Sequence, residues 1–376
     1  MRILVVGGGI GGLTLAIALR QQGLRPEIVE RAPGWSPAGA GIVLGINAMR
    51  LMRRLGVAAA LAARGVVVGR GAITDAAGSV LSAMDLREFA GDGQPGIAIH
   101  RAALHEVLAG ALRDIPVRHR TTPRRILADG DPVTVELDDG SRQAYDLVVG
   151  ADGIRSFVRD AAFGPNPPIY SGYTCWRLVV QQPAEVDGTV EMWGRGRRFG
   201  LVPIGDGQIY CFATLNAPAG TPDPPAGRLE RFRAVFAEFR GAVPAVLAQL
   251  MRPEELIHND LEEVRQSPWY RGRIVLLGDA AHASTPNMGQ GAAMAIEDAI
   301  VLAEEVGRAQ ALGDALAAYV RRRLPRAGWV QEQSRRIGRV GQLEHPAACW
   351  LRNTLVRLTP QRVAAANLRR LFEQPI

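Results

Sequence analysis

A glycine-rich stretch close to the N-terminus has the residue types and spacing of a dinucleotide-binding site. Gly7, Gly9 and Gly12 follow the pattern G-x-G-x-x-G. In this pattern the glycines permit a tight turn, close approach of the backbone to a pyrophosphate, and close packing of the next helix on the preceding strand. Ile10 and Gly11 complete the turn, where the amides at a helix N-terminus bind phosphate. The stretch therefore predicts a dinucleotide held through its phosphates.

The elements around this turn are those that the motif requires. Residues 3–6 form a continuous apolar run, typical of a parallel strand buried on both faces, and residues 13–19 continue with helical spacing. A second strand is expected over residues 26–29 and leads to Glu30, which Arg31 follows. A carboxylate about 20 residues after the glycines can hydrogen-bond a ribose 2′-hydroxyl. Glu30 is therefore a candidate ribose ligand, and Arg31 is a further candidate contact to the dinucleotide.

Two further apolar strands lead directly into small turns that carry an acid. The first turn holds Asp152 and Gly153, and the second holds Gly278 and Asp279. Both acids could serve as turn or helix-capping residues, but after strands of a dinucleotide fold we favour ligand contacts.

Small residues also open a long helix near the C-terminal third of the chain. Pro286 precedes Gly289, and Gly291 and Ala292 begin the helix. Small side chains at a helix start let backbone amides come close to a ligand. This segment is a candidate ligand site.

A hairpin is expected around the turn 205–207, between strands that include residues 199–202 and 208–212. Its even-numbered residues share one face, which predicts that Arg198 lies beside Tyr210 and that the two orient an acidic or phenolic ring. The alternative is a surface arginine and a half-buried tyrosine. The nearby aromatic side chains are expected mainly in the sheet core, with a substrate wall as the less favoured interpretation: Trp176, Trp193, Phe199 and Phe212.

The composition narrows the classes of protein that remain. The 376 residues are 47% hydrophobic and 22% charged, which is typical of a folded protein of about two to three domains. The three cysteines lie far apart, without the spacing of a zinc site, so we expect reduced thiols, no metal and a cytoplasmic protein. The net charge is +7 and every basic residue is arginine, which suits an anionic dinucleotide or an acidic substrate as well as nucleic acid. We expect no nucleic-acid partner and no membrane span, and we expect the late arginine-rich helices over residues 321–339 to present a solvated face.

The three ordered motifs together resemble the FAD-dependent aromatic monooxygenases, the single-component flavoprotein hydroxylases of the p-hydroxybenzoate hydroxylase type. These motifs are the fingerprint over residues 7–12 with Glu30, the pair Asp152–Gly153 and the pair Gly278–Asp279. The stretches 39–42, 101–104 and 286–299 are similar to flavin-contacting segments of the family. One departure is Ala293, where many members carry asparagine.

The resemblance implies an α/β fold: a dinucleotide-binding, Rossmann-like FAD domain with an inserted sheet-rich substrate domain and C-terminal helices. We expect the discontinuous FAD-binding domain over residues 1–68, 100–165 and 266–320. The substrate domain is expected over residues 69–99 and 166–265, and the C-terminal helical segment over residues 321–376.

The resemblance also implies roles for single residues. The nucleotide half of FAD would lie on residues 7–12, and Gly41 and Arg101 would contact the cofactor, Arg101 at its pyrophosphate or ribityl chain. Asp279 would hold a ribityl hydroxyl, and the Asp152 turn would contact FAD and the nicotinamide donor. Pro286, Gly289, Gly291 and Ala292 would lie at the flavin ring, and Pro286 and Gly289 count with Arg198 and Tyr210 as catalytic candidates.

The implied reaction transfers a hydride from NADH or NADPH, bound transiently, to FAD. Reaction with O₂ would then give a flavin hydroperoxide that hydroxylates an aromatic or heteroaromatic small molecule. Two alternatives remain open: a non-oxygenating reductase or oxidase, and a protein that sequesters FAD and a ligand. The chain is expected to act as a monomer or a homodimer.

Overall fold

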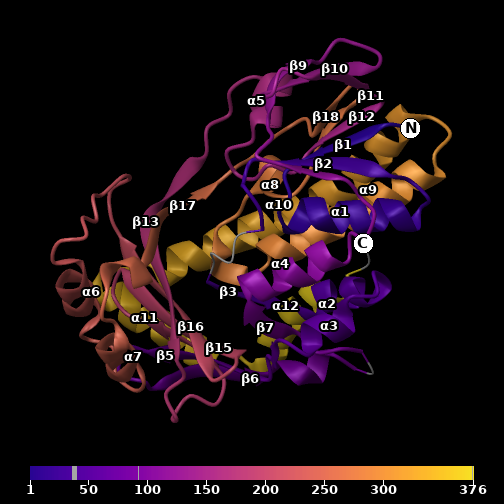
Figure 1. The fold of residues 1–376 in the computed structure, drawn as a ribbon. Helices are drawn as coiled ribbons and strands as arrows, with labels where there is room; N and C mark the ends of the chain where they lie inside the picture. The colour runs from indigo at the N-terminus through magenta and orange to yellow at the C-terminus, as the bar shows by residue number, and fades with distance from the viewer. Residues whose placement is uncertain (36–39, 92, 375) are drawn as a thin grey trace.

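A six-stranded sheet forms one of two large layers of the computed structural model, which describes residues 1–35, 40–91, 93–374 and 376 (Figure 1). Its strands are parallel except for the edge strand β18, which is antiparallel to β19. In sheet order they are β18 (Tyr270–Arg271), β19 (Ile274–Leu276), β12 (Leu147–Gly150), β1 (Ile3–Val6), β2 (Pro26–Glu30) and β8 (Val117–His119). All four residues of β1 are buried, because helices and loops cover both faces of a parallel sheet.

Helices from both ends of the chain pack beside this sheet. Helix α1 contacts α9, α9 contacts α10, and α5 contacts β12 (Figure 1). The bounds are α1 (Ile10–Gln21), α4 (Arg101–Gly110), α5 (Phe157–Phe163), α8 (Asp279–His282), α9 (Gly291–Arg308) and α10 (Leu312–Gly341). A small antiparallel sheet contains β9 (Pro123–Leu127), β10 (Val133–Leu137) and β11 (Arg142–Tyr145).

A seven-stranded sheet makes up the second large layer (Figure 1). It is antiparallel except for the pair β14 and β5. In sheet order its strands are β17 (Ile257–Glu263), β13 (Ile169–Gln181), β16 (Gln208–Asn216), β15 (Arg197–Gly205), β14 (Thr189–Trp193), β5 (Arg70–Asp75) and β6 (Val80–Asp85). One face packs on α6 (Arg228–Phe236) and α7 (Val243–Gln249), where alternate residues such as Phe199 and Cys211 join Phe232 and Phe236 in one apolar cluster. The opposite face of the seven-stranded sheet is therefore free to contact another part of the molecule.

A second three-stranded sheet lies against the seven-stranded sheet. It contains β3 (Gly41–Leu44), β7 (Ile97–His100) and β4 (Val66–Val67), and β3 contacts both β15 and β16. The remaining elements are α2 (Ile46–Arg54), α3 (Ala58–Ala62), η1 (Leu86–Phe89), η2 (Pro253–Glu255), η3 (Pro286–Met288), α11 (Pro346–Leu358) and α12 (Gln361–Glu373). None of the helices in the described residues combines the length and the hydrophobicity that crossing a bilayer requires.

Two expected elements differ in the structure. The sequence pattern predicts helix over residues 228–250, but two separate helices form, because Gly241 adopts the left-handed conformation (φ +61°) and Pro244 lies in the first turn of α7. The boundary expected between residues 320 and 321 falls inside α10, which continues through Pro325. Gly39 lies outside the described residues. The division into an FAD-binding and a substrate domain remains a proposal.

Candidate functional site

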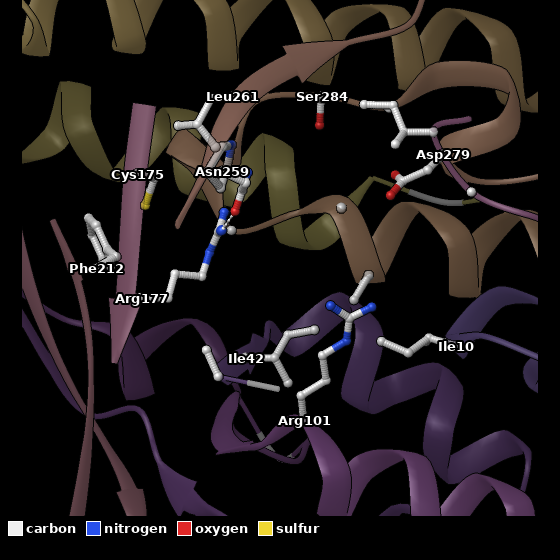
Figure 2. A pocket seen from close by; sticks show the side chains of 18 of the residues that line it. Ile10, Ile42, Arg101, Cys175, Arg177, Phe212, Asn259, Leu261, Asp279 and Ser284 are labelled. Atoms are coloured by element: carbon white, nitrogen blue, oxygen red, sulfur yellow. Dashed lines mark hydrogen bonds between the residues drawn. The ribbon is translucent and has the colours of Figure 1, made fainter. Parts of the chain in front are cut away.

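A cavity of about 1000 Å³ lies between the six-stranded sheet and the open face of the seven-stranded sheet. The start of α1, the start of α4 and the Gly278–Asp279 turn line one side, and strands β13, β15, β16 and β17 line the other. Figure 2 shows Ile10, Arg101 and Asp279 across the cavity from Arg177 and Phe212. The predicted nucleotide segments and the predicted substrate strands therefore meet in one space.

The glycine-rich turn has the close packing that its motif predicts. Gly7 has a φ of +105°, and a Cβ on Gly12 would lie 2.0 Å from the Gly7 carbonyl oxygen. Larger residues are therefore excluded at both positions, because L-residues rarely adopt this φ and a methyl group cannot overlap an oxygen. Gly9, Ile10 and Gly11 line the cavity.

Glu30 ends β2 beside this turn, where the sequence places it. Its carboxylate accepts hydrogen bonds from the backbone N–H of Gly8 (2.7 Å) and of Ala32 (2.8 Å). A carboxylate has about four lone-pair sites, so Glu30 keeps capacity for a ribose hydroxyl. His105, which sequence reasoning did not assign to the site, supports the same turn through Nε2, 2.8 Å from the Gly8 carbonyl oxygen.

Asp152 has the capping role that the sequence left as an alternative. Its Oδ1 accepts from the Ser156 hydroxyl (2.5 Å) and its Oδ2 from the Val158 N–H (3.1 Å), at the start of α5. Burial raises the pKa of this carboxyl, although the same hydrogen bonds oppose the shift. Gly153 and Arg155, by contrast, line the cavity. Direct contact of Asp152 with a ligand remains a prediction, as it does for the other predicted residues that lie outside the lining: Gly7, Gly12, Glu30 and Arg31.

Asp279 is exposed towards the cavity (Figure 2). Desolvation by the surrounding protein still raises the pKa of its carboxyl, and the nearby His282 and Arg101 oppose the shift. Arg101, the first residue of α4, points into the same side of the cavity as Asp279 (Figure 2). An acid and a fixed cation thus both face the space expected for the cofactor.

Asp298 holds the turn that carries Asp279. Its Oδ2 accepts from the Gly278 N–H (2.9 Å) and lies 2.5 Å from His282 Nε2, and its Oδ1 accepts from Arg323 Nε (2.7 Å). Burial disfavours the charge of Asp298, but His282 and Arg323 outweigh it and lower the pKa to about 2. His282 is therefore a structural histidine that supports the turn.

The expected solvated arginine face on the late helices is wrong for two residues. Arg323 and Arg326 are 0% and 3% exposed, because α10 packs against α9 and both guanidinium groups donate to Glu297. Asn47 also donates to Glu297 (2.8 Å) and to Gln290 at the start of α9 (3.0 Å). The network thus ties α10 to the helix start that lines the cavity.

The start of α9 faces the cavity as predicted. Pro286, Gly289, Gly291 and Ala292 all line it. Ala293 is fully buried and lies outside the lining, so the departure at this position leaves the cavity wall unchanged.

The hairpin turn and the shared face of Arg198 and Tyr210 are confirmed, but their proximity is wrong. Arg198 lies opposite Thr214, and Tyr210 lies opposite Val202. Four residues along β15 separate Arg198 from Val202, roughly 13 Å at about 3.3 Å per residue. Both Arg198 and Tyr210 line the cavity.

Arg198 is also no surface residue, because it is 2% exposed. Its guanidinium donates to Glu191 (2.8 Å), Asn287 (2.7 Å) and Gln342 (3.0 Å), and it lies over the ring of Tyr173 at 5.6 Å. Its donors are therefore largely used within the protein, where they fix the polar end of the cavity wall.

The rest of the wall combines aromatic, apolar and polar groups. Phe212, expected in the core, lines the cavity and lies across Gly200, whose added Cβ would be 2.0 Å from the ring. Burial raises the pKa of Tyr210 well above its ordinary value, so its hydroxyl stays protonated. Arg177 donates to Asn259, and no sequence pattern singled out either residue, because their strands β13 and β17 pair across a long separation in the chain.

The cavity fits an extended dinucleotide. A methyl group added at Gly9, Gly153, Gly289 or Gly291 would meet no atom within 4 Å, so the backbone at each position faces open space. Arg101 adds a cation for phosphate, and two helix starts supply amides.

Comparisons with known proteins agree with this geometry. A family model described as an FAD binding domain matches residues 1–334. The chain is 42% identical over 385 residues to the aurachin C monooxygenase/isomerase of Stigmatella aurantiaca, covering 100% of this chain and 99% of that protein. It is 38% identical to the 2-heptyl-3-hydroxy-4(1H)-quinolone synthase of Pseudomonas aeruginosa, with 100% and 97% covered. The solved structure of Klebsiella pneumoniae HpxO complexed with FAD and uric acid has a TM-score of 0.89 and 28% identity, covering 97% of this chain and 95% of that chain.

Proposed function

The chain belongs to the family of FAD-dependent aromatic monooxygenases, and on this basis we propose that it hydroxylates a bicyclic heteroaromatic ring that carries an alkyl chain, of the 2-alkyl-4(1H)-quinolone class. It is an oxidoreductase with FAD as its cofactor. NADH or NADPH is the electron donor typical of this family.

The proposed substrate class rests on the combination of polar and apolar residues in the cavity wall. Arg177 and Asn259 offer hydrogen-bond donors and an acceptor that suit a ring carbonyl and a ring N–H. Phe212, Val202 and Leu261 provide apolar surface beside them for the ring face and an alkyl chain. The relative that shares 38% identity makes a 3-hydroxylated 2-heptyl quinolone by its name, and the substrate of such a hydroxylation lacks the 3-hydroxyl group.

The residues around FAD would act by position and charge. FAD, when bound, accepts a hydride from NAD(P)H and activates O₂. The backbone amides of Gly291 and Ala292 would stabilise negative charge on the flavin ring of FAD. Asp279 would hold the ribityl chain of FAD, and Arg101 its pyrophosphate or ribityl chain. Tyr210 would donate a hydrogen bond rather than act as a base, because burial keeps it protonated.

The sheet face would hold the substrate and exclude water. Phe212 over Gly200 closes the wall with an aromatic ring, and the ion pair between Arg198 and Glu191 fixes its polar end. A dry, shaped cavity favours hydroxylation over release of hydrogen peroxide.

The test supplies the FAD-loaded enzyme with NAD(P)H, ¹⁸O₂ and 2-heptyl-4(1H)-quinolone. We expect slow NAD(P)H oxidation alone, faster oxidation with the quinolone, and one ¹⁸O atom in the product. Asp279→Ala should release more hydrogen peroxide per NAD(P)H oxidised. Product that carries oxygen from water would refute the monooxygenase assignment. No response to the quinolone, together with a response to uric acid or 6-hydroxynicotinate, would refute the substrate class alone.

We also propose a cytoplasmic enzyme, since its three cysteines are unpaired thiols. We propose a monomer or a homodimer. Size-exclusion chromatography with light scattering tests this, and a tetramer would refute it. A tetrameric form is known for 2-methyl-3-hydroxypyridine-5-carboxylic acid oxygenase, a solved structure of 26% identity and TM-score 0.77 that covers 89% of this chain and 89% of that one.

A further inference from the structure

Helix α11 turns its large apolar side chains towards solvent. Trp350, Leu351, Leu355 and Leu358 are 69%, 50%, 57% and 72% exposed. Their spacing of one, five and eight residues places them along one side of a helix, and we call them the α11 stripe. An ordinary surface helix shows the reverse arrangement, with its apolar side towards the core.

The other side of α11 is fixed to the protein. Cys349 and Arg352 are buried, and the Arg352 guanidinium donates to the carbonyl oxygens of Gly341 (3.0 Å) and Gly194 (3.1 Å). It also lies over the Trp193 ring at 5.2 Å. A rotation that buried the stripe would break these contacts and expose polar groups that are now paired, so the outward orientation is the stable one.

The segment that carries the stripe is basic. Residues 346–372 contain five arginines and no acidic residue. Arg357, Arg362 and Arg369 are exposed, and Arg357 also donates to Asp75 of β5 (3.1 Å). A basic segment that exposes tryptophan and leucine on one side of a helix is typical of a segment that lies on an anionic membrane surface.

We propose that the α11 stripe docks this enzyme on the surface of an anionic lipid bilayer, with α11 lying in the plane of the interface. A second copy of the chain is the less suitable occupant. A two-fold interface would bring the same basic face onto itself, whereas anionic lipids complement it. The proposal goes beyond the oxygenation reaction and holds whatever the substrate is, although an alkyl-substituted substrate would partition into the same bilayer.

The experiment measures cosedimentation of the FAD-loaded protein with vesicles. We expect binding to vesicles of phosphatidylcholine and phosphatidylglycerol, weaker binding to phosphatidylcholine alone, and weakening by salt. Trp350→Asp with Leu358→Asp should lower the partition coefficient by about tenfold or more, because apolar area and charge drive such binding. Arg362→Glu with Arg369→Glu should weaken binding only to the anionic vesicles.

The matched control is Met251→Asp, which alters a side chain that is 77% exposed next to the end of α7. It should bind vesicles like the wild type. Retained FAD absorbance per protein shows that each variant is folded. Absence of wild-type binding, or equal binding by the Trp350→Asp, Leu358→Asp variant, would overturn the proposal. So would a wild-type dimer that this variant converts to a monomer, since the stripe would then be a subunit interface.

Discussion

Replacing Asp298 by asparagine should weaken both the fold and the affinity for FAD. The carboxylate is fully buried and pairs with the Gly278 N–H, His282 and Arg323. Asparagine keeps the shape but offers one acceptor oxygen and turns an NH₂ group towards a donor. At least one buried donor is left without a partner, and the positive charge of Arg323 loses one of its two carboxylates.

The structure sets the size of both effects. Breaking a buried ion pair by removing one partner costs about 3 to 5 kcal/mol. For a chain of 376 residues, this corresponds to a fall in Tm of about 4 to 6 °C by the usual unfolding entropy per residue. A buried Gly278 N–H without a partner costs about 1 to 3 kcal/mol. When the turn no longer presents Asp279 to the cofactor, a loss of this size in binding free energy corresponds to a rise in the Kd for FAD of about 10- to 100-fold.

The assay is differential scanning calorimetry of the FAD-free protein, combined with FAD titration. The FAD-free form is used because bound ligand would itself raise Tm. Glu332→Gln on α10 is the control, since it removes a carboxylate that pairs with Arg335 and Arg336 at the surface; its Tm should change by less than about 1 °C. An unchanged Tm for Asp298→Asn would refute the role of the buried network. A lower Tm with an unchanged Kd would refute the claim that Asp298 positions the turn for FAD.

Three further results are expected. Glu30→Ala should raise the FAD Kd about 10- to 100-fold through a lost buried hydrogen bond, and an unchanged titration would remove Glu30 from the site. Gly200→Ala should lower kcat/KM for the quinolone by about tenfold or more, because its Cβ would lie 2.0 Å from the Phe212 ring and push it into the cavity; Phe212→Leu in the same background should restore part of the activity, and full activity of Gly200→Ala alone would contradict the wall geometry. The folded-state pKa of Asp298 is lowered from 3.8 to about 2, so its contribution of about 2 kcal/mol is complete above about pH 4 and is lost as the pH falls through 2. Calorimetry between pH 4 and pH 2 should therefore show a steeper fall of Tm for the wild type than for Asp298→Asn, and equal slopes would exclude this titration.

The sequence predicted the nucleotide side of the cavity because its signals are local. A buried parallel strand is a continuous apolar run, and the turn after β1 needs glycines at Gly7 and Gly12 for steric reasons that act within a few residues. The capping role of Asp152 was less accessible, because an acid before a short helix has the same local pattern whether it caps the helix or binds a ligand. Only the position of its oxygens distinguishes the two.

The substrate wall depended on contacts between distant segments. Alternation within the hairpin predicted the shared face of Arg198 and Tyr210, since it follows from the pleat of two neighbouring strands. It could not place Asn259 beside Arg177, because β17 joins β13 from about 80 residues away and nothing in either strand sets that pairing. The same limit explains why Phe212 was expected in the core: an aromatic residue in a strand can pack on either face, and only the packing of α6 and α7 decides which face is covered.

Helix α10 joins the two sides of the cavity, and this connection explains why arginines of a late helix are buried. Arg323 binds Asp298, which holds the turn that carries Asp279. Nineteen residues further on, roughly 28 Å along the helix axis at about 1.5 Å per residue, Gln342 accepts from Arg198 on the substrate wall. One continuous helix thus contacts the cofactor side near its middle, and the residue that caps its C-terminal end contacts the substrate side. A hydroxylating flavoenzyme must hold its substrate at a fixed position relative to the cofactor. The buried polar contacts of α10 serve this purpose, although apolar residues at the same positions would cost less desolvation free energy.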